Sequence, residues 1–178
     1  MSLQNGNISL RAIEPADINI LFSWENDTQY WVLSNTMAPY SKHVLNKYLE
    51  NAHLDIYEAK QLRMVIEVDG IRPIGLIDLF EFDPFHLRAG VGILIADNKD
   101  QGKGYASKAL EILIDYSFNH LQLRQLFCNI TVDNERSIKL FEKAGFELIG
   151  TKKKWLKTVE GWKDENMYQL VNKNFDIE

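Results

Sequence analysis

Gly102 and Gly104 lie in a turn between an apolar segment and a helical pattern, within the stretch Val91–Ser107. After this turn, apolar residues recur at steps of three and four: Ala106, Ala109, Leu110, Leu113, Ile114, Phe118 and Leu121. This spacing is typical of one face of an amphipathic helix. The first N–H groups of a helix have no partner within it, and the helix dipole is positive there. Since glycine has no side chain to cover those groups, the stretch predicts an anion site, most simply for phosphate.

Two common phosphate-binding motifs do not fit this turn. A P-loop requires Gly-x-x-x-x-Gly-Lys-Ser/Thr, which residues 102–105 do not supply. A dinucleotide fold requires Gly-x-Gly-x-x-Gly and an acidic residue about 20 positions further on. Ser107 stands where the third glycine belongs, and Leu-Arg-Gln occupies residues 123–125. Both of these nucleotide-binding motifs are therefore disfavoured.

Two other patterns, in residues 101–106 and 134–146, fit a known family. Gln101, Gly104 and Ala106 supply Gln-x-x-Gly-x-Ala, and the second segment reads Asn-Glu-Arg-Ser-Ile-Lys-Leu-Phe-Glu-Lys-Ala-Gly-Phe. The first resembles the acyl-CoA pyrophosphate loop of the GCN5-related N-acetyltransferases (GNAT). The second resembles the N-x-x-S-I-x-L-x-E-K-x-G-F segment of the same family. The resemblance implies acetyl transfer from acetyl-CoA to an amine.

This resemblance covers nearly the whole chain. Residues 10–17 contain Leu-Arg, Glu-Pro and Asp, and residues 160–170 contain Glu-Gly-Trp-Lys-Asp, Tyr and Leu. Both segments resemble the branch that includes ribosomal-protein N-terminal and spermidine acetyltransferases. The implied acceptor is a primary amine, either a protein N-terminal α-amine or a polyamine or other small cationic amine.

Periodicity predicts the elements that must position these residues. Apolar patterns predict strands at residues 8–13, 63–68, 74–80, 86–95 and 126–132. Capping residues and helical spacing predict helices that begin near Pro15, Ser41, Gly104 and Asn134. Glu160-Gly161 lies between two further segments and predicts a hairpin. Residues 25–40 lack a clear period, which predicts a long aromatic loop that is either functional or simply packed over the core.

These elements predict one domain over residues 1–178, of the mixed α+β class. A central, twisted and mostly antiparallel sheet would be flanked by about four helices. The strand that ends at Val132 should run parallel to the one that ends at Ile95, because the helix after Gly104 is a crossover. In the GNAT fold that the resemblance implies, this parallel pair splays apart at the acyl-CoA site.

The resemblance also implies cofactor contacts, residue by residue. Backbone groups near Ile93, Leu94 and Ile95 would pair with the pantetheine amides, as an added strand does. Backbone N–H groups of the loop would hold the pyrophosphate: Gly102, Lys103, Gly104, Tyr105, Ala106 and Ser107. Further cofactor contacts are implied for Gln101, Asn134, Phe141 and Lys143. The Lys103 side chain either adds charge or is a solvated turn residue, and Asn134 is also a helix cap.

The catalytic groups depart from the family pattern at two positions. The amine must lose a proton to attack, whereas a thiolate with a pKa near 8.5 leaves with little help. Many relatives carry a tyrosine that acts as the acid at the position of Phe141. Ser137 is the candidate replacement for this acid; the alternative is that Ser137 only caps or solvates the first turn of the helix. Many carry a glutamate where Gly90 stands, and Glu81 is the best replacement. Weaker candidates are Asp78 and Glu25, with solvated surface charge as the alternative for each carboxylate.

Composition narrows the classes of function. The chain has 178 residues, of which 46% are hydrophobic, and this suits one domain with a sizeable core. No apolar run approaches the ~20 residues of a membrane helix, and no secretory signal is visible. The net charge of −5 disfavours nucleic acid as a partner and favours a cationic one. The three lysines at residues 152–154 could attract an anion or a nucleic-acid backbone, but we interpret them as solubilising charges at the edge of a sheet.

The cysteine and histidine usage indicates a reducing compartment and no metal. Cys128 is the single cysteine and lies in an apolar strand, so we expect an inert core thiol and a cytoplasmic protein. The four histidines show no ligand spacing, so no metal site is predicted.

One alternative function remains open at the level of sequence. A non-catalytic CoA-binding sensor or regulatory module of the same fold would also explain why Phe141 and Gly90 replace two common catalytic residues. The sequence predicts either a monomer or a homo-oligomer and does not decide between them.

Overall fold

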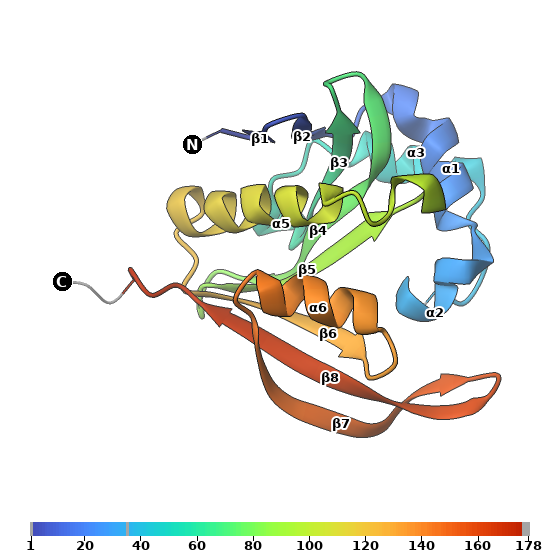
Figure 1. Ribbon diagram of the computed structural model, residues 1–178. Coiled ribbons are helices and arrows are strands. Elements are labelled where there is room, and N and C mark those ends of the chain that lie inside the picture. The colour runs from blue at the N-terminus through green and yellow to red at the C-terminus, as the bar shows by residue number, and fades with distance from the viewer. Residues whose placement is uncertain (1, 35, 176–178) are drawn as a thin grey trace.

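One eight-stranded sheet organises the molecule. The computed structural model describes residues 2–34 and 36–175, whose strands lie in the order β1-β2-β3-β4-β5-β6-β8-β7 (Figure 1). Their bounds are β1 Gln4–Asn5, β2 Ile8–Ala12, β3 Leu62–Val68, β4 Arg72–Asp83, β5 Arg88–Ile95, β6 Gln125–Thr131, β7 Glu147–Thr158 and β8 Gly161–Val171. All neighbouring pairs are antiparallel except β5 with β6. The predicted sheet, with one parallel pair, is confirmed.

Four helices of eight or more residues are present among the described residues, in agreement with the predicted number. They are α1 Ile18–Glu25, α3 Lys42–Glu50, α5 Tyr105–Asp115 and α6 Glu135–Lys143. Two single-turn helices, α2 Trp31–Ser34 and α4 Ile56–Ala59, join them. Residues 25–40, expected to be a loop, contain α2 and a 3₁₀ turn at Thr28–Tyr30. Elements this short have too few turns to give a periodic pattern.

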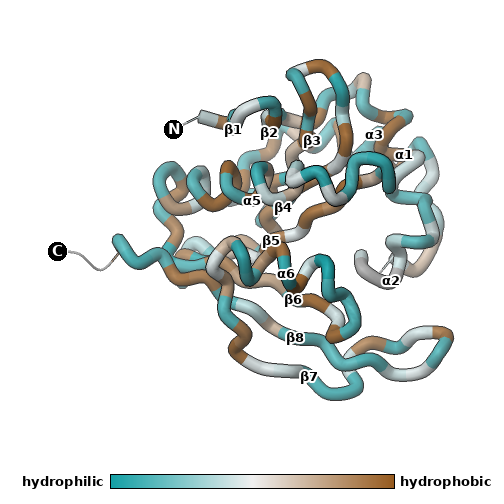
Figure 2. Tube along the Cα trace, in the orientation of Figure 1, coloured by the Kyte–Doolittle hydropathy of each residue, from teal (hydrophilic) through white to brown (hydrophobic). Residues whose placement is uncertain are grey.

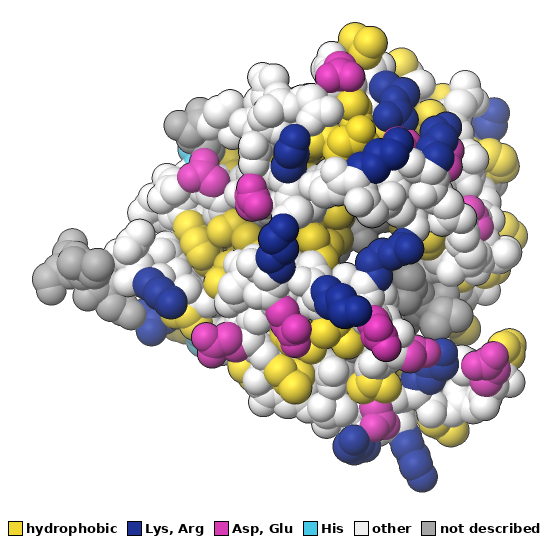
Figure 3. All heavy atoms as spheres, in the orientation of Figure 1, with side chains coloured by type: hydrophobic (Ala, Val, Ile, Leu, Met, Phe, Trp, Pro, Cys, Tyr) yellow, Lys and Arg dark blue, Asp and Glu magenta, His cyan; other side chains and the backbone are white. Residues whose placement is uncertain are grey.

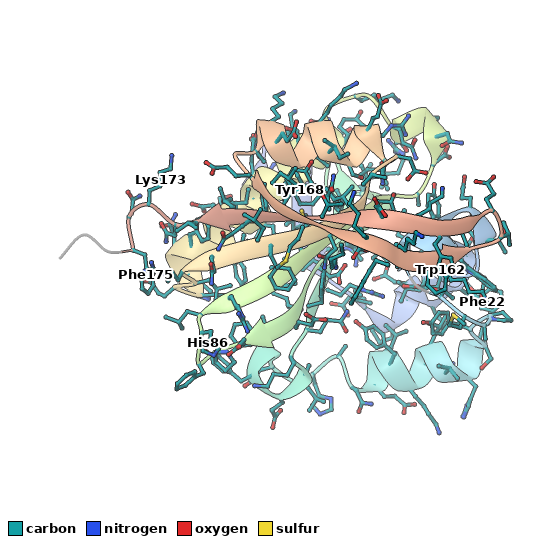
Figure 4. The ribbon with its side chains drawn as sticks, turned by 90° about the horizontal axis from the view of Figure 1, so that it is seen from below. Phe22, His86, Trp162, Tyr168, Lys173 and Phe175 are labelled. Atoms are coloured by element: carbon teal, nitrogen blue, oxygen red, sulfur yellow. The ribbon has the colours of Figure 1, made fainter. Side chains whose placement is uncertain are left out.

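The helices cover both faces of the sheet. α5 and α6 lie over one face, and α1 and α3 lie over the other, as the view from below shows (Figure 4). Alternation along β3 separates two cores: Ile66 packs in the core that contains Leu110 of α5, whereas Val65 packs with Leu21 of α1 and Leu45 of α3. The hydropathy trace shows apolar segments along the central strands and α5 (Figure 2).

The parallel pair separates after three residues. β5 pairs with β6 only where Arg88, Ala89 and Gly90 face Gln125–Phe127, although β5 continues to Ile95. From Cys128 onward, β6 pairs with β8 alone. The predicted splay is therefore present, and it leaves one edge of β5 open beyond Gly90.

No described helix has the length and apolar character that crossing a membrane requires.

Candidate functional site

The loop before α5 is shaped by two glycines in the left-handed region. Gly102 has φ +76° and Gly104 has φ +80°, a conformation that side chains disfavour. Gly104 is the N-cap of α5 and supplies no capping side chain. The first N–H groups of α5, on Tyr105, Ala106 and Ser107, therefore lack a partner within the helix. They point to one place, where the helix dipole also favours an anion.

An ion pair to a buried carboxylate holds this loop against the sheet. Asp100 is 2% exposed, and Arg72 of β4 donates to its two oxygens at 2.7 and 3.1 Å. These hydrogen bonds hold the pKa of the Asp100 carboxyl below its usual value. Lys103 Nζ lies 3.6 Å from the same carboxylate. The Lys103 ammonium, which the sequence offered as an added charge for the phosphate, is thus directed at Asp100.

The start of α6 lies across from this loop. The Asn134 side chain accepts a hydrogen bond from Ser137 N–H at 3.2 Å, which confirms Asn134 as a helix cap. Arg136 donates to the Gln101 side chain, and Gln101 Nε2 in turn donates to the Ile95 carbonyl at 3.1 Å. This chain of contacts joins α6, the loop and the end of β5.

A cavity of about 320 Å³ opens between these elements, and we name it the loop cavity. Its walls come from β5, the loop, α5, α6 and the 3₁₀ turn at Thr28–Tyr30. The lining residues are Tyr30, Ile93, Leu94, Ile95, Asp100, Gln101, Gly102, Gly104, Tyr105, Ala106, Ser107, Asn134, Arg136, Ser137 and Leu140. Figure 3 shows Lys and Arg side chains on the face that carries α5 and α6, with Asp and Glu side chains between them. The cavity therefore combines an apolar wall with an anion-binding end.

The open edge of β5 offers backbone groups to this cavity. Ala96 N–H donates to the Ile74 carbonyl of β4 at 2.9 Å. Since hydrogen-bonding direction alternates along an antiparallel strand, Leu94 also faces β4. Ile93 and Ile95 instead turn their N–H and C=O groups toward the open edge. Of the three residues predicted to pair with an added strand, Ile93 presents both groups and Ile95 presents its N–H, since the Ile95 carbonyl accepts from Gln101 Nε2.

A second cavity lies against the same strand, and its lining is rich in carboxylates. This carboxylate cavity, of about 420 Å³, is lined by Glu25, Tyr30, Ser34, Arg63, Leu76, Asp78, Phe80, Glu81, Gly92, Ile93 and Leu94. Arg63 donates to Glu25 at 2.6 Å and lies 4.0 Å from Asp78. Burial disfavours the charged guanidinium, but the two carboxylates outweigh it and raise the pKa of Arg63.

Glu81 occupies a break in the pairing of β4 with β5. The register shifts between Phe80 and Asp83, and Glu81 has φ +48°. Such bulges redirect side chains next to active sites. Glu81 lines the carboxylate cavity, and within the described part of the chain its carboxylate makes no hydrogen bond or ion pair.

Gly90 leaves space that a neighbouring ring fills. A Cβ atom at Gly90 would lie 2.4 Å from Phe80 Cε2. The Phe80 ring packs edge-on against Phe127 of β6 at a centroid distance of 5.8 Å. A carboxylate side chain at position 90 would therefore have no room. The Phe80 ring occupies the space that the glutamate of other family members would need.

Between the splayed strands lies a smaller cavity of about 120 Å³, which we name the gap cavity. Ser137 and Asn134 line both this cavity and the loop cavity, and Ile93 lines all three cavities. The gap cavity is also lined by Cys128, which is 1% exposed. Burial raises the pKa of the Cys128 thiol to about 12, so the thiol is neutral and unreactive, as expected.

The structure brings most of the predicted cofactor residues together and leaves three outside the loop cavity. Lys103 is directed at Asp100. Phe141 is 3% exposed, packs against Phe146 and lines only the gap cavity. Lys143 is exposed at the end of α6 and lines none of the described cavities. Both α6 residues lie toward the helix end away from the cavity.

Sequence reasoning missed several lining residues. Arg136 and Leu140 follow Asn134 on α6, and the spacing of positions 136, 137 and 140 on one helix face was a signal that could have found them. Tyr30 hydrogen-bonds to the Ala96 carbonyl at 3.2 Å and lines two cavities. Arg63 carried no local signal, because its role depends on partners from α1 and β4.

No group of three or more metal-ligating side chains is found among residues 2–34 and 36–175. The prediction that no metal is needed stays a prediction.

The chain matches the model of the family described as "Acetyltransferase (GNAT) domain" over residues 7–147. Among curated relatives, spermidine N(1)-acetyltransferase of Vibrio cholerae is 31% identical over 145 residues, which are 80% of each chain. The enzyme of the same name from Escherichia coli is 31% identical over 147 residues, 81% of this chain and 75% of the relative. An aminoglycoside N(6')-acetyltransferase of Klebsiella pneumoniae is 26% identical over 161 residues, 83% of this chain and 77% of the relative.

Solved structures agree with this assignment. The V. cholerae spermidine N-acetyltransferase in complex with CoA and spermine superposes with a TM-score of 0.85 at 25% identity, covering 96% of this chain and 99% of that one. These findings confirm the predicted fold, family, enzymatic class and acetyl-CoA as the co-substrate. The chain belongs to the GNAT family of acetyl-CoA-dependent N-acetyltransferases.

Proposed function

We propose that this enzyme acetylates a primary amine of a polyamine or a similar small cationic amine. The observation that carries the proposal is the open edge of β5, where Ile93 lines both the loop cavity and the carboxylate cavity. Acetyl-CoA bound on one side and an amine on the other would meet at this edge. The named activity of the V. cholerae and E. coli relatives supports this acceptor class over a protein N-terminus.

Acetyl-CoA is assigned to the loop cavity. The pyrophosphate is held by the N–H groups at the start of α5 and by Arg136, whose side chain lies across from them. The pantetheine extends along β5 and pairs with Ile93 and Ile95 as an added strand. The acetyl carbonyl then lies near the splay, where Ile93 N–H stabilises the tetrahedral oxyanion.

The reactive amine of the acceptor is assigned to the carboxylate cavity, beside Glu81. An alkylamine has a pKa near 10 and is almost entirely charged at neutral pH, so it must lose a proton before it attacks. Glu81 is the base in this proposal, because its carboxylate is unpaired while Asp78 and Glu25 are engaged by Arg63. The amine nitrogen forms a bond to the acetyl carbon, and the CoA thiolate leaves.

Ser137 is assigned as the proton donor to the departing thiolate. It lines both the loop cavity and the gap cavity, at the first turn of α6. Phe141, which cannot donate a proton, is buried beside the gap cavity. Since the thiolate is a good leaving group, the donor contributes only modestly.

An acceptor panel tests the proposal. Free CoA thiol would be measured after acetyl-CoA is mixed with polyamines, aminoglycosides or short peptides with varied N-termini, and products would be identified by mass spectrometry. We expect release with polyamines. Release with peptides alone would reject the proposed acceptor class, and binding of acetyl-CoA without release for any amine would favour a non-catalytic CoA-binding module.

We also propose a cytoplasmic location, which the free thiol of Cys128 supports, because reduced cysteines are typical of reducing compartments. Fractionation of the producing cells tests it, and recovery of the protein outside the cytoplasmic fraction would reject it.

A further inference from the structure

The side-chain ammonium of Lys152 is held by groups from three strands. On β7, Lys152 forms an ion pair with Glu165 of β8, and its Nζ donates to Asn129 Oδ1 of β6 at 3.1 Å. The same Nζ lies 4.9 Å from the centroid of the Trp155 ring. A carboxylate, an amide oxygen and an aromatic face thus surround one primary ammonium.

A bulge in β7 assembles this arrangement. In a regular strand, Lys152 and Trp155 would point to opposite faces, since they are three residues apart. The register shifts between Lys152 and Leu156, and Lys154 adopts φ +48°. Asp164 fixes the bulge by accepting from Lys154 N–H at 2.7 Å. The bulge therefore places the Trp155 ring on the side where Lys152 lies.

The three groups recognise an ammonium by their chemistry. Glu165 is 8% exposed, and a carboxylate buried to this degree requires a cation. The Asn129 oxygen accepts a second N–H, and the indole face attracts positive charge. We name Glu165, Asn129 and Trp155 the ammonium cage.

The cage lies within a large cavity that also reaches Glu81. This hairpin cavity, of about 910 Å³, is lined by Glu81, Lys152 and all three cage residues, among others. Asn129 and Glu165 also line the gap cavity that contains Ser137. The cavity lies along the hairpin of β7 and β8 at the edge of the sheet, and Figure 4 labels Trp162 near the tip of this hairpin and Tyr168 further along β8.

We propose that the ammonium cage is a binding subsite for a distal ammonium of the acceptor, and that Lys152 occupies it when no acceptor is bound. This inference rests on the proposed function, because it assumes that the reactive amine lies near Glu81. A polyamine spans the hairpin cavity and displaces the Lys152 ammonium from Glu165. A monoamine leaves Lys152 in place, so the cage favours acceptors with at least two ammonium groups.

Lys152→Met tests this inference, because it removes the competing ammonium and keeps most of the apolar side chain. We expect the KM for spermidine to fall about tenfold with kcat unchanged, since the cage becomes free for the substrate. The KM for n-butylamine, which lacks a distal ammonium, should change by less than about twofold. A spermidine KM that is unchanged, or that moves in parallel with that of n-butylamine, would overturn the proposal.

A second measurement does not depend on turnover. Lys152→Met leaves Glu165 without a cation, so spermidine should raise the Tm of this variant more than that of the wild type. Equal shifts would contradict the cage. If no amine is acetylated but the unequal shifts are found, the proposed function fails and the cage stands.

The same hairpin supplies a matched control. Lys157 is exposed on the same strand and lines none of the described cavities. Lys157→Met should leave both readouts at wild-type values. Adding Glu165→Gln to Lys152→Met should abolish the gain in spermidine affinity, and a gain that persists would overturn the role of Glu165.

Discussion

Glu81 reaches two cavities because β4 and β5 fall out of register beside it. Its left-handed backbone, at φ +48°, is a conformation that costs a non-glycine residue free energy. The Phe80 ring, next to it in the chain, covers Gly90. At the scale of the residue, the two features are therefore linked. Phe80 fills the space beside Gly90, and the next residue, Glu81, supplies an exposed carboxylate instead.

Glu81→Gln should lower kcat/KM for spermidine by about a hundredfold near neutral pH, because the amine then lacks a base. The defect should shrink toward pH 10, where the free amine becomes abundant. Initial rates of CoA release across this pH range measure it. Glu147→Gln, at an exposed position that lines none of the described cavities, is the control. Rates within about twofold of the wild type at every pH would exclude Glu81 as the base.

Ser137→Ala should lower kcat by about tenfold and leave the KM for acetyl-CoA unchanged. The hydrogen bond to Asn134 uses the backbone N–H of Ser137, so the helix cap survives the substitution. Steady-state kinetics would show the split between kcat and KM. An unchanged kcat would leave Ser137 with a structural role only.

The Cys128 thiol should resist alkylation in the folded protein at pH 8, because its pKa of about 12 keeps it protonated and the side chain is buried. Mass spectrometry after treatment with iodoacetamide measures the labelled fraction. Rapid labelling without denaturant would show that the strand opens or that the thiol is ionised.

Residues whose roles depend on local sequence could be predicted, and those that depend on distant partners could not. Asn134 was found as a helix cap, because capping needs only the next three residues. Arg63 was missed, because its charge is balanced by Glu25 and Asp78 from two other elements. Lys152 was interpreted as edge charge, since the bulge that turns Trp155 toward it leaves no mark in the sequence.

At the scale of the element, the start of α5 requires glycine at position 104 because of its backbone conformation, not because a side chain there would clash. A Cβ at Gly104 would meet no atom within 4 Å, yet φ is +80° there. Gly104→Val should weaken CoA binding by at least about tenfold, because the left-handed cap is lost and the first N–H groups turn away. Isothermal titration calorimetry measures the Kd.

Gly70→Val is the matched control for this change. Gly70 has φ +68° and open space around it, but lies in the turn between β3 and β4. Gly70→Val should lower the free energy of unfolding by roughly 1–2 kcal/mol, as Gly104→Val does, without a change in the Kd for CoA. Equal losses of CoA affinity in both variants would mean that general destabilisation, and not the loop, weakens binding.

Two buried aspartates should make the fold sensitive to acid. Hydrogen bonds from Arg11 hold the pKa of Asp17 below its usual value, and those from Arg72 do the same for Asp100. Because both pKa values are lower in the folded chain, the stabilisation is complete above about pH 4 to 5 and is lost as the pH falls through the folded values. Urea unfolding between pH 7 and pH 3 should show a falling midpoint.

Asp100→Asn, which cannot ionise, should flatten this acid dependence. A wild-type midpoint that does not change from pH 7 to pH 3 would contradict the contribution of these ion pairs.

Most elements could be predicted from periodicity, and their order in the sheet could be predicted only in part. The hairpin around Glu160-Gly161 was identified from its turn, but the turn does not say which of its strands joins β6. It is β8 that pairs with β6, and Tyr168, at 2% exposure, packs in the core there. Such long-range pairing depends on side-chain packing that a local pattern does not contain.

At the scale of the whole molecule, three cavities share lining residues of β5 where this strand splays from β6. The loop cavity lies beside α5 and α6, and the carboxylate cavity is lined by residues of α1, β3 and β4. Both are lined by Ile93 and Leu94 of β5. A cofactor and an acceptor held in this way would react directly, without an acetylated enzyme as an intermediate.

The sequence predicted this arrangement through the family resemblance, because two motifs placed the loop and α6 on either side of one strand. On the acceptor side it named Glu81, Asp78 and Glu25 as candidate bases, but it could not predict the cavity that gathers them around Arg63, because these residues lie far apart in the chain. The prediction of a monomer or a homo-oligomer also stays open. Light scattering coupled to size exclusion would decide it.

Mass spectrometry of one reaction mixture would show whether the acetyl group passes directly from acetyl-CoA to the amine. The enzyme would be mixed with an equal amount of acetyl-CoA, first alone and then with spermidine. Without the amine, we expect intact acetyl-CoA and unmodified enzyme. When the amine is added, we expect acetylspermidine with an equal amount of free CoA. Intact acetyl-CoA in the presence of spermidine, with the cofactor shown to be bound, would contradict this expectation.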